Sequence, residues 1–411
     1  MSKKSNVPYT DISPLMSPKS VALIGATDHL TSFGGRVYQQ MMGFGFPGRI
    51  YPINPRLPEI RGVPCFPNLK SLPEVPDHVG IVLATTRVFD ALADCVEAGV
   101  KFCTVFSGGF KETGTPEGAA LQQRLIEFGQ QHGIRFMGPN CNGIVNFIDR
   151  FAMTSTAAIK GPRALAGDVG VVSHSGGLGQ INVMWRAMEI GLGISYEASC
   201  GNEADIDTID FARFMVRSEA TNIVLMAVEA IKNGDKFRAL AQEAAEAETP
   251  LVVLKIGATE AGSKAAASHT GAIAGDNDIL DAVLKQYGCI RVHECYELYE
   301  TAVFLRKRRW PKARGLAAVA PTGGNIVNLA DAGAMYDLQW NPFTQATQGA
   351  LAPLMPGYGK VGNPTDLTSA ATGNQDFYRT ALNTIVADPG VEVMIPIVPS
   401  PNRKEIGRAH V

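Results

Sequence analysis

The feature that most constrains the fold of this chain is the regular alternation of short apolar runs with helix-length segments. The apolar runs of the first third are residues 20–24, 49–53, 78–83, 102–106 and 135–137. Helical stretches such as 89–98 and 117–132 lie between these runs. Near-continuous apolar runs are typical of parallel strands that are buried on both faces of a sheet. The alternation therefore predicts an α/β fold with parallel sheets.

A second set of elements follows residues 151–167, a stretch of small residues that we interpret as a linker or crossover. Its expected strands are residues 170–173, 194–198, 223–228, 251–256 and 290–292. Its expected helices are residues 177–190, 204–216, 236–246 and 276–287. A third unit opens with a strand at 315–320 and reaches another apolar run at 391–398. We therefore expect three domains, over residues 1–150, 163–310 and 311–405.

Composition and charge argue against several classes of function. The formal net charge of the 411-residue chain is -2, so no overall positive field attracts nucleic acid or an anionic membrane. The seven cysteines include no C-x-x-C pair and no cluster at metal-ligand spacing, which favours a reduced cytosolic protein without a metal site. No signal peptide and no apolar run of membrane-spanning length is visible. We expect a cytoplasmic, bacterial protein.

The first glycine-rich turn, residues 23–36, joins a strand to a helix. Its glycines would let backbone N–H groups approach a phosphate at the helix N-terminus. The turn lacks the G-x-G-x-x-G fingerprint, and Asn54-Pro55-Arg56 ends the next strand where nicotinamide enzymes often carry an acidic residue. The pattern favours a nucleotide-like ligand other than NAD; the alternative is a turn whose glycines serve only close packing.

The second glycine-rich turn, residues 172–179, again lies between a strand and a helix. Ser173, Ser175 and bare amides at the helix start could form a nest for a phosphate or an oxyanion. The turn is not a nucleophile elbow, because Ser173 stands where that motif needs glycine. His174 could be a ligand or a base, but we interpret it as a local hydrogen-bonding residue.

A third segment, residues 255–275, leaves an expected strand and becomes a long stretch of small residues. His269 stands alone in this stretch, between Ser268 and Thr270. A structural imidazole needs apolar packing partners, which alanine and glycine supply poorly, whereas a bare loop leaves a histidine accessible to substrates. We therefore interpret His269 as a reactive residue.

The segment Ala267-Ser268-His269-Thr270-Gly271-Ala272 resembles the phosphohistidine motif of the nucleotide-diphosphate-forming acyl-CoA synthetases. This superfamily includes acetate–CoA ligase (ADP-forming) and succinyl-CoA synthetase. Other motifs agree in the family's order and cover nearly the whole chain. They are Ile24-Gly25-Ala26, Asn54-Pro55, Ser107-Gly108-Gly109-Phe110-Lys111-Glu112, Gly138-Pro139-Asn140-Cys141-Asn142-Gly143, Ser173-His174-Ser175-Gly176-Gly177, Gly201-Asn202-Glu203-Ala204-Asp205 and Asn363-Pro364-Thr365-Asp366-Leu367.

The resemblance implies a Rossmann-like CoA-binding domain followed by flavodoxin-like, succinyl-CoA synthetase-like domains. It also implies an acid–CoA ligase of the ADP-forming type. Such an enzyme makes acyl-CoA from a carboxylic acid, coenzyme A and ATP, through an acyl phosphate and a phosphohistidine, here at His269. The family binds ATP or ADP with Mg in an ATP-grasp module, either a separate subunit or a fused C-terminal domain. No such module is visible in these residues, so we expect the chain to be inactive alone and to work in an oligomer.

The resemblance also assigns site residues. Glu229 matches the glutamate that orients the histidine; the alternative is a surface acid that caps a strand end. The phosphate-binding residues would be Ser173, Ser175, Gly176 and Gly177. The CoA-binding residues would be Gly25, Ser32, Arg36, Asn54, Arg56 and Asn140. Ala84-Thr85-Thr86 departs from the proline-bearing loop that is common in the family, so these residues are not assigned to coenzyme A.

Two other functions stay open at this point. One is a non-catalytic CoA-binding regulatory or scaffold module of an acetyltransferase-like fusion, against which the presence of His269 argues. The other is a nicotinamide-dependent reductase, against which the missing fingerprint argues. Acetate, dicarboxylates and aromatic acids are all open as substrates. Residues 406–411 resemble a translated sequencing adapter, so we expect the natural protein to continue beyond Lys404.

Overall fold

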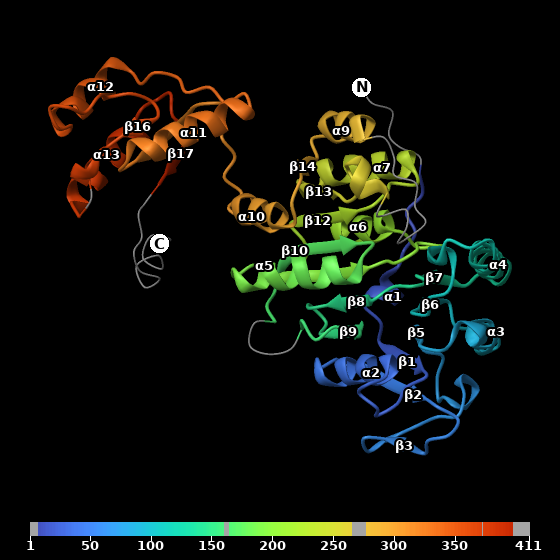
Figure 1. The fold of residues 1–411 in the computed structure, drawn as a ribbon. Helices are drawn as coiled ribbons and strands as arrows, with labels where there is room; N and C mark the ends of the chain where they lie inside the picture. Colours follow the sequence, from blue (N-terminus) through green and yellow to red (C-terminus); the bar gives the residue numbers. More distant parts are fainter. Residues whose placement is uncertain (1–6, 160–163, 265–276, 372, 398–411) are drawn as a thin grey trace. The chain divides into compact units, whose positions relative to one another are not determined.

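The computed structural model describes residues 7–159, 164–264, 277–371 and 373–397 (Figure 1). His269 and residues 406–411 lie outside these described ranges. The chain divides into two compact units, Met1–Lys307 and Arg308–Val411. Both units are built from parallel strands and connecting helices, which confirms the predicted α/β class. No described helix is both long and apolar enough to cross a membrane.

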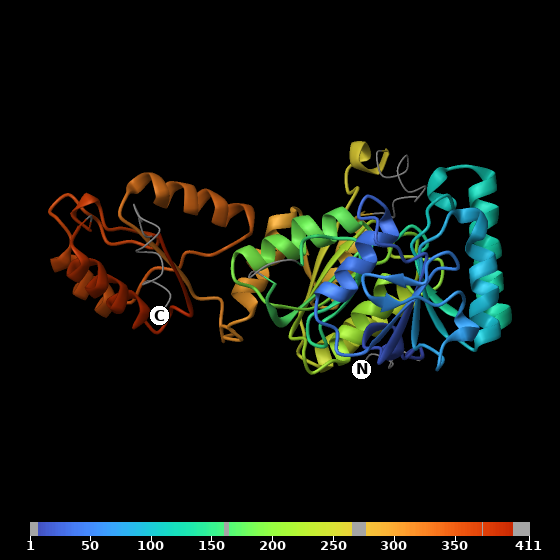
Figure 2. The ribbon, with the colours of Figure 1, turned by 90° about the horizontal axis from the view of Figure 1, so that it is seen from below.

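The first sheet of the larger unit is parallel and has the strand order β2-β1-β5-β6-β7. Its strands are β1 (Ser20–Ile24), β2 (Arg49–Ile53), β5 (His78–Ile81), β6 (Phe102–Val105) and β7 (Arg135–Met137). Helix α2 (Phe33–Gly43) covers one face, and helices α3 (Val88–Ala98) and α4 (Pro116–His132) cover the other (Figures 1 and 2). Three short elements complete this part, namely α1 (Ser13–Met16), β3 (Glu59–Ile60) and β4 (Val63–Pro64).

The second sheet has the strand order β14-β13-β12-β10-β11-β8-β9. Five strands are parallel, namely β10 (Ala166–Ser173), β11 (Ile194–Ser199), β12 (Ile223–Val228), β13 (Leu251–Lys255) and β14 (Ile290–Val292). Two are antiparallel, β8 (Gly143–Asn146) and β9 (Phe151–Thr154). One face is covered by α6 (Thr208–Arg217) and α7 (Gly234–Glu246), and the other by η4 (Leu178–Trp185), α5 (Arg186–Glu189) and α10 (Cys295–Leu305). Helix α9 (Asn277–Gln286) precedes β14.

The two sheets of the larger unit share one hydrophobic core. Val21 and Leu23 of β1 belong to the same buried cluster as Phe151 of β9 and Phe211 of α6. Each of these side chains is fully buried, and burial of such a side chain contributes roughly 1.5–3 kcal/mol. The shared core therefore holds the first sheet firmly against the second.

The structure corrects the expected linker at residues 151–167. Phe151–Thr154 form β9, whose four residues are all buried, and β10 already begins at Ala166. The small residues that follow hid these elements, because they weaken the apolar pattern on which the interpretation rested. The domain limits at 150 and 163 stay a prediction, although β8 and β9 both belong to the second sheet.

Two expected helices also differ in their bounds or their backbone conformation. Helix α6 begins at Thr208 rather than at 204, because Asp207 and Asp210 form a reciprocal capping box at its N-terminus. The expected helix 177–190 has α-helical backbone at residues 176–177, continues as the π-helix η4 and ends as α5. The late start of α6 leaves residues 204–207, which follow β11 near the candidate site, outside helix.

The smaller unit contains a three-stranded parallel sheet of order β16-β15-β17. Its strands are β15 (Leu316–Ala320), β16 (Thr365–Asp366) and β17 (Val393–Pro396). Its helices are α11 (Gly323–Met335), α12 (Gln345–Leu351) and α13 (Gln375–Val386). Ala317, Val319, Leu351 and Ile385 are buried in a core of its own, separate from that of the larger unit.

Candidate functional site

The candidate site lies at the carboxyl end of β10, which pairs with β11 on one side and β12 on the other. The crossover from β10 runs to β11, whereas the crossover from the adjacent β12 runs in the opposite direction, to β13. Such a switch point is where parallel α/β sheets bind their ligands. A pocket of about 280 Å³ opens there. It is lined by Lys111, Asn140, His174, Ser175, Gly176, Gly177, Gly201, Asn202, Glu229, Ala230 and Lys232.

The pocket brings together five of the residues that the sequence nominated. Ser175, Gly176 and Gly177 come from the turn after β10, and Glu229 follows β12. Asn140 comes from the loop after β7, in the first sheet, although it was nominated for coenzyme A. The larger unit thus joins loops from both sheets at one pocket.

Ser173 occupies a different place from the other nest residues. It is fully buried and does not line the pocket. Its hydroxyl donates to the Ser175 carbonyl at 3.1 Å and accepts the Ser175 N–H at 3.1 Å. The Ser175 hydroxyl in turn accepts the N–H of Leu178 at 3.4 Å. Ser173 therefore shapes the turn, whereas Ser175, Gly176 and Gly177 form its accessible surface.

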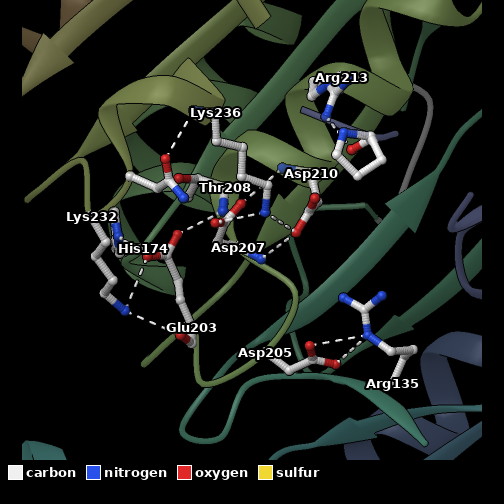
Figure 3. Close-up of polar contacts among 12 residues, drawn as sticks. Arg135, His174, Glu203, Asp205, Asp207, Thr208, Asp210, Arg213, Lys232 and Lys236 are labelled. Atoms are coloured by element: carbon white, nitrogen blue, oxygen red, sulfur yellow. Dashed lines mark hydrogen bonds and ion pairs between the residues drawn. The ribbon is translucent and has the colours of Figure 1, made fainter. Parts of the chain in front are cut away.

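A buried ion network borders the pocket and joins three loops (Figure 3). The carboxylate of Glu203, after β11, lies 2.9 Å from His174 Nε2 and 3.3 Å from Lys232 Nζ. It also accepts the backbone N–H of Thr208 at 2.6 Å. The side chain of Glu203 is 2% exposed and that of His174 is 8% exposed. A carboxylate this deeply buried needs such partners, because an unpaired buried charge is strongly destabilising.

The network lowers the pKa of Glu203 and raises the pKa of His174. Burial alone would raise the pKa of Glu203, but His174, Lys232 and the Thr208 N–H outweigh it and lower the pKa to about 2. Burial alone would lower the pKa of His174, but the Glu203 carboxylate outweighs it and raises that pKa. Glu203 is therefore ionised throughout the physiological range.

His174 makes a second contact that limits how far its ring can charge. Its Nδ1 accepts the backbone N–H of Glu229 at 3.2 Å. A protonated Nδ1 cannot accept that bond, so this contact favours the neutral ring with its proton on Nε2, toward Glu203. The imidazole thus links the backbone at the end of β12 to the carboxylate after β11.

The Glu229 side chain is nearly buried and belongs to the pocket wall. Lys255, the last residue of β13, pairs with Val228, the residue just before Glu229. Burial lowers the pKa of Lys255, an effect that Arg291 reinforces and Glu229 opposes. His269, which Glu229 is expected to orient, lies outside the described residues, so this pairing stays a prediction.

The loop that carries Glu203 packs backbone against backbone on the loop that carries Asn140. The N–H groups of Asn202 and Ala204 donate to the carbonyls of Pro139 and Gly138, each at 2.9 Å. A Cβ on Gly201 would collide with the Asn140 carbonyl oxygen. Glu203 itself has a φ of 51°, a left-handed conformation that costs a non-glycine residue roughly 1–2 kcal/mol. The contacts of its carboxylate offset this strain.

A second buried carboxyl group, Glu197 of β11, lies behind the turn after β10. It accepts hydrogen bonds from Gln180 Nε2 at 2.8 Å and from the Ser199 hydroxyl at 2.5 Å. Burial raises its pKa to about 8, and these two bonds only partly oppose the rise. Gly179 leaves no room between Ser173 and Glu197 for a larger side chain. Glu197 therefore supports the turn in its neutral form at pH 7.

The nominated CoA residues, apart from Asn140, gather at the carboxyl ends of β1 and β2. Gly25 has a φ of 89°, and a Cβ there would collide with the Val82 carbonyl oxygen. The Asn54 amide donates to the Ala26 carbonyl at 2.9 Å and accepts the Arg56 N–H at 3.0 Å. Ser32 caps α2 by accepting the Gly35 N–H at 3.1 Å. Gly25 therefore serves close packing of the turn against the loop after β5, the alternative considered for this turn, while Ser32 fixes the start of α2.

Arg36 lies on the first turn of α2. Its guanidinium donates to the Thr31 carbonyl at 3.0 Å and lies over the Phe33 ring at 5.5 Å. Of the two arginines predicted to bind coenzyme A, Arg36 is the one in the first turn of α2. Among the described residues, no group of three or more histidine, cysteine or acidic side chains could hold a metal ion.

Sequence reasoning missed Glu203 and Lys232 and gave His174 only a local role. Glu203 was noticed as part of a motif, and its position just after β11 matches that of Glu229 after β12. This position was the available signal, since carboxyl ends of parallel strands meet at one edge. The pairing itself depends on the register of β10, β11 and β12.

Two protein families match adjoining parts of the chain. Residues 19–146 match the family described as CoA binding domain. Residues 166–305 match the family described as succinyl-CoA ligase like flavodoxin domain. These ranges contain the first glycine turn and the pocket residues after β10, β11 and β12, respectively.

Individual relatives extend the likeness along nearly the whole chain. The chain is 32% identical over 403 residues to acetate–CoA ligase [ADP-forming] II of Archaeoglobus fulgidus, with 96% of this chain and 58% of that protein covered. It is 34% identical over 380 residues to the alpha subunit of acetate–CoA ligase [ADP-forming] I of Pyrococcus furiosus, with 91% and 80% covered. The fold is similar to a dinucleotide-forming acetyl-coenzyme A synthetase of Ca. Korarchaeum cryptofilum solved with phosphate and ADP. For that pair the TM-score is 0.81 and the identity 28%, with 94% and 81% covered.

Proposed function

The chain belongs to the ADP-forming acetate–CoA ligase family, and from this premise we propose that it supplies the CoA-binding and phosphohistidine parts of an acyl-CoA synthetase. The overall reaction would make acyl-CoA from a small carboxylic acid, coenzyme A and ATP. His269 would carry the phosphoryl group between the nucleotide and the acid. ATP would phosphorylate His269 with departure of ADP, and the phosphohistidine would pass the group to the carboxylate. The thiol of coenzyme A would then displace phosphate from the acyl phosphate. Passing the group through a covalent intermediate on His269 is nucleophilic catalysis.

The observation that carries the proposal is the pocket at the end of β10. It combines the backbone amides of Gly176 and Gly177 and the Ser175 side chain with the carboxylate-bearing Glu229. Amides at the start of a helix suit a phosphoryl group, because their dipoles offset its negative charge. A carboxylate beside a histidine fixes the tautomer that can attack. We therefore propose that Ser173 shapes this nest and that Glu229 orients His269.

Coenzyme A would bind at the carboxyl edge of the first sheet. The N-terminus of α2, together with Arg36 in its first turn, fits an anionic phosphate. Ser32, Asn54 and Arg56 hold or border the turn between β1 and α2. Asn140 instead lines the pocket after β10, so we propose that it lies where the acyl end of coenzyme A would reach the phosphoryl site.

The nucleotide would be bound, with Mg, by an ATP-grasp module on another subunit or further along the natural polypeptide. The chain spans 58% of the Archaeoglobus fulgidus relative and 80% of the Pyrococcus furiosus alpha subunit. The Pyrococcus furiosus relative is an alpha subunit, which favours an ATP-grasp module on a separate partner subunit. We propose that the complex works as an oligomer in the cytoplasm. A bacterial origin stays a prediction, since the relatives named above are archaeal.

The proposal is tested by phosphorylating the chain with Mg–ATP in the presence of its ATP-grasp module. The wild-type chain should acquire phosphate that is labile to acid and stable to base, as expected for phosphohistidine. His269→Asn should acquire none, and without the module the wild-type chain should neither be phosphorylated nor release acyl-CoA. His132→Asn, which changes an exposed histidine of α4, is the matched control and should behave like wild type.

Two results would contradict the proposal. Undiminished phosphorylation of His269→Asn would show that another residue carries the group. Coenzyme A binding without any phosphorylation, even with the ATP-grasp module present, would favour the alternative of a regulatory or scaffold module.

A further inference from the structure

The buried network beside the pocket contains three charged or ionisable residues to which the proposed reaction gives no role. Glu203 is the centre of this network, with His174 and Lys232 as its partners. His174 and Lys232 line the pocket, and Glu203 lies directly behind them. A buried carboxylate beside a site for a phosphoryl group would repel that group unless cations offset its charge. The pocket therefore depends on how these partners are held.

Lys232 is the partner with a free path to the pocket, because about half of its side chain is exposed. Its Nζ donates to the Asn202 carbonyl at 2.8 Å and to the Glu203 carbonyl at 3.1 Å. An ammonium group has three N–H donors, so one remains for the Glu203 carboxylate at 3.3 Å or for an anion in the pocket. Two hydrogen bonds to backbone carbonyls of one loop, together with the charge of the nearby Glu203 carboxylate, thus hold a normally flexible side chain at the pocket wall and leave its third N–H for an anion.

We propose that Glu203 is a positioning residue, which holds the Lys232 ammonium as a contact for a phosphoryl oxygen and holds His174 where it anchors the Glu229 backbone. This inference rests on the proposed function and assigns parts within the same pocket. One carboxylate sets the distance between the anion-binding side of the pocket, at Lys232, and the side that carries Glu229. Preorganisation of this kind removes the need to order side chains when the phosphoryl group arrives.

The first test measures binding of inorganic phosphate to the purified chain by titration calorimetry, which needs neither His269 nor a partner. Lys232→Met should weaken phosphate binding by about tenfold, the loss expected for one charge-assisted contact. Lys236→Met is the matched control, because Lys236 pairs with Asp207 and Asp210 outside the pocket. It should bind phosphate like wild type. Unchanged binding by Lys232→Met would overturn the inference.

Glu203→Gln separates positioning from simple electrostatics. Removing a negative charge beside the pocket should by itself tighten anion binding, whereas loss of the group that holds Lys232 should weaken it. The proposal requires weaker binding in the wild-type background and no such weakening in the Lys232→Met background. Tighter binding in both backgrounds would overturn it.

Two variants of His174 separate its two contacts. Glutamine can place a donor near the position of Nε2 and keep the bond to Glu203, whereas asparagine can place an acceptor near Nδ1 and keep the bond to Glu229. His174→Gln should therefore keep phosphate affinity but slow phosphorylation in the complete enzyme, while His174→Asn should weaken phosphate binding. The reverse pattern would contradict the assignment. A chain in which Lys232→Met lowers phosphate affinity but His269→Asn is still phosphorylated would retain this inference and lose the proposed function.

Discussion

At the scale of single residues, Glu197, which supports the turn after β10, makes the free energy of unfolding depend on pH. Its pKa is raised from an ordinary value near 4.5 to about 8 by complete burial. Between these two values the unfolded chain carries the ionised carboxylate, while the folded chain keeps the proton. Unfolding then releases a proton, so the stability of the fold falls as pH rises through this window.

Replacing Glu197 by glutamine should remove this dependence. A glutamine can accept from Gln180 and donate to the Ser199 hydroxyl, so the hydrogen bonds survive without a charge to bury. We expect Glu197→Gln to match wild type near pH 4.5 and to be more stable by about 4 kcal/mol at pH 8, since each unit of pKa shift corresponds to about 1.4 kcal/mol. Denaturant unfolding at several pH values measures the difference. A constant difference across the window would contradict a raised pKa.

The sequence could predict single residues where a strand end meets a recognisable turn. Ser175, Gly176, Gly177 and Glu229 were nominated in this way, and the structure brings them to one pocket. Glu203 and Lys232 could not be assigned, because their roles depend on a contact between loops that are distant in the sequence. The role of His174 was underestimated for the same reason.

At the scale of elements, the loop after β11 is positioned by close contact with the loop after β7. Gly201 has a φ of 64°, and its missing Cβ leaves space for the Asn140 carbonyl. Gly133, at the end of α4, has nearly the same φ of 63° but open space where a Cβ would be. The two glycines therefore share the same left-handed backbone conformation, but only at Gly201 would a Cβ collide with neighbouring atoms.

Alanine substitutions at these two positions should separate crowding from strain. Gly133→Ala should cost about 1 kcal/mol, because only the left-handed conformation is penalised. Gly201→Ala should cost about 3 kcal/mol or more and should also weaken phosphate binding, since Glu203 moves with its loop. Thermal unfolding and phosphate titration of both variants check this. Equal costs would show that the loop contact is not tight.

Most elements could be predicted from apolar periodicity, and several strands match to the residue. β1, β2, β7, β12 and β14 have the expected bounds. The elements that differ are those whose limits depend on side-chain caps or on pairing. Asp207 delays the start of α6, and β9 is specified by its pairing with β8 rather than by a long apolar run.

At the scale of the whole molecule, the division into Met1–Lys307 and Arg308–Val411 coincides with a basic, exposed segment. Between α10, which ends at Leu305, and β15, which begins at Leu316, the backbone forms neither helix nor strand. Arg306, Lys307, Arg308 and Arg309 are all exposed there. Exposed segments outside regular structure are the preferred sites of proteolysis.

Limited trypsin digestion should therefore cut the native chain first within residues 306–314. Two fragments should accumulate, and mass spectrometry identifies their ends. Arg213 is the internal control, because it is buried in α6 and paired with Glu243 at 2.6 Å. It should resist cleavage until the larger unit unfolds. Early cleavage at Arg213 would contradict the compactness of this unit.

The order of the domains along the chain could be predicted from the sequence. Which strands belong to which sheet could not be predicted in full. Residues 143–154 follow the first set of strands in sequence and yet form the edge of the second sheet. Antiparallel pairing of β8 with β11 places them there. No periodicity in residues 143–154 distinguishes this partner from a strand of the first sheet.

The β8–β9 hairpin also has a consequence for recombination between related proteins. A chimaera joined at residue 150 would take β8 from one parent and β9 from the other, although the two strands pair and are both buried. Mismatched parental strands would then meet inside a core that both sheets share. A junction before Gly143 would transfer the hairpin from one parent. Successful exchange of CoA-binding modules should therefore favour crossovers upstream of the hairpin.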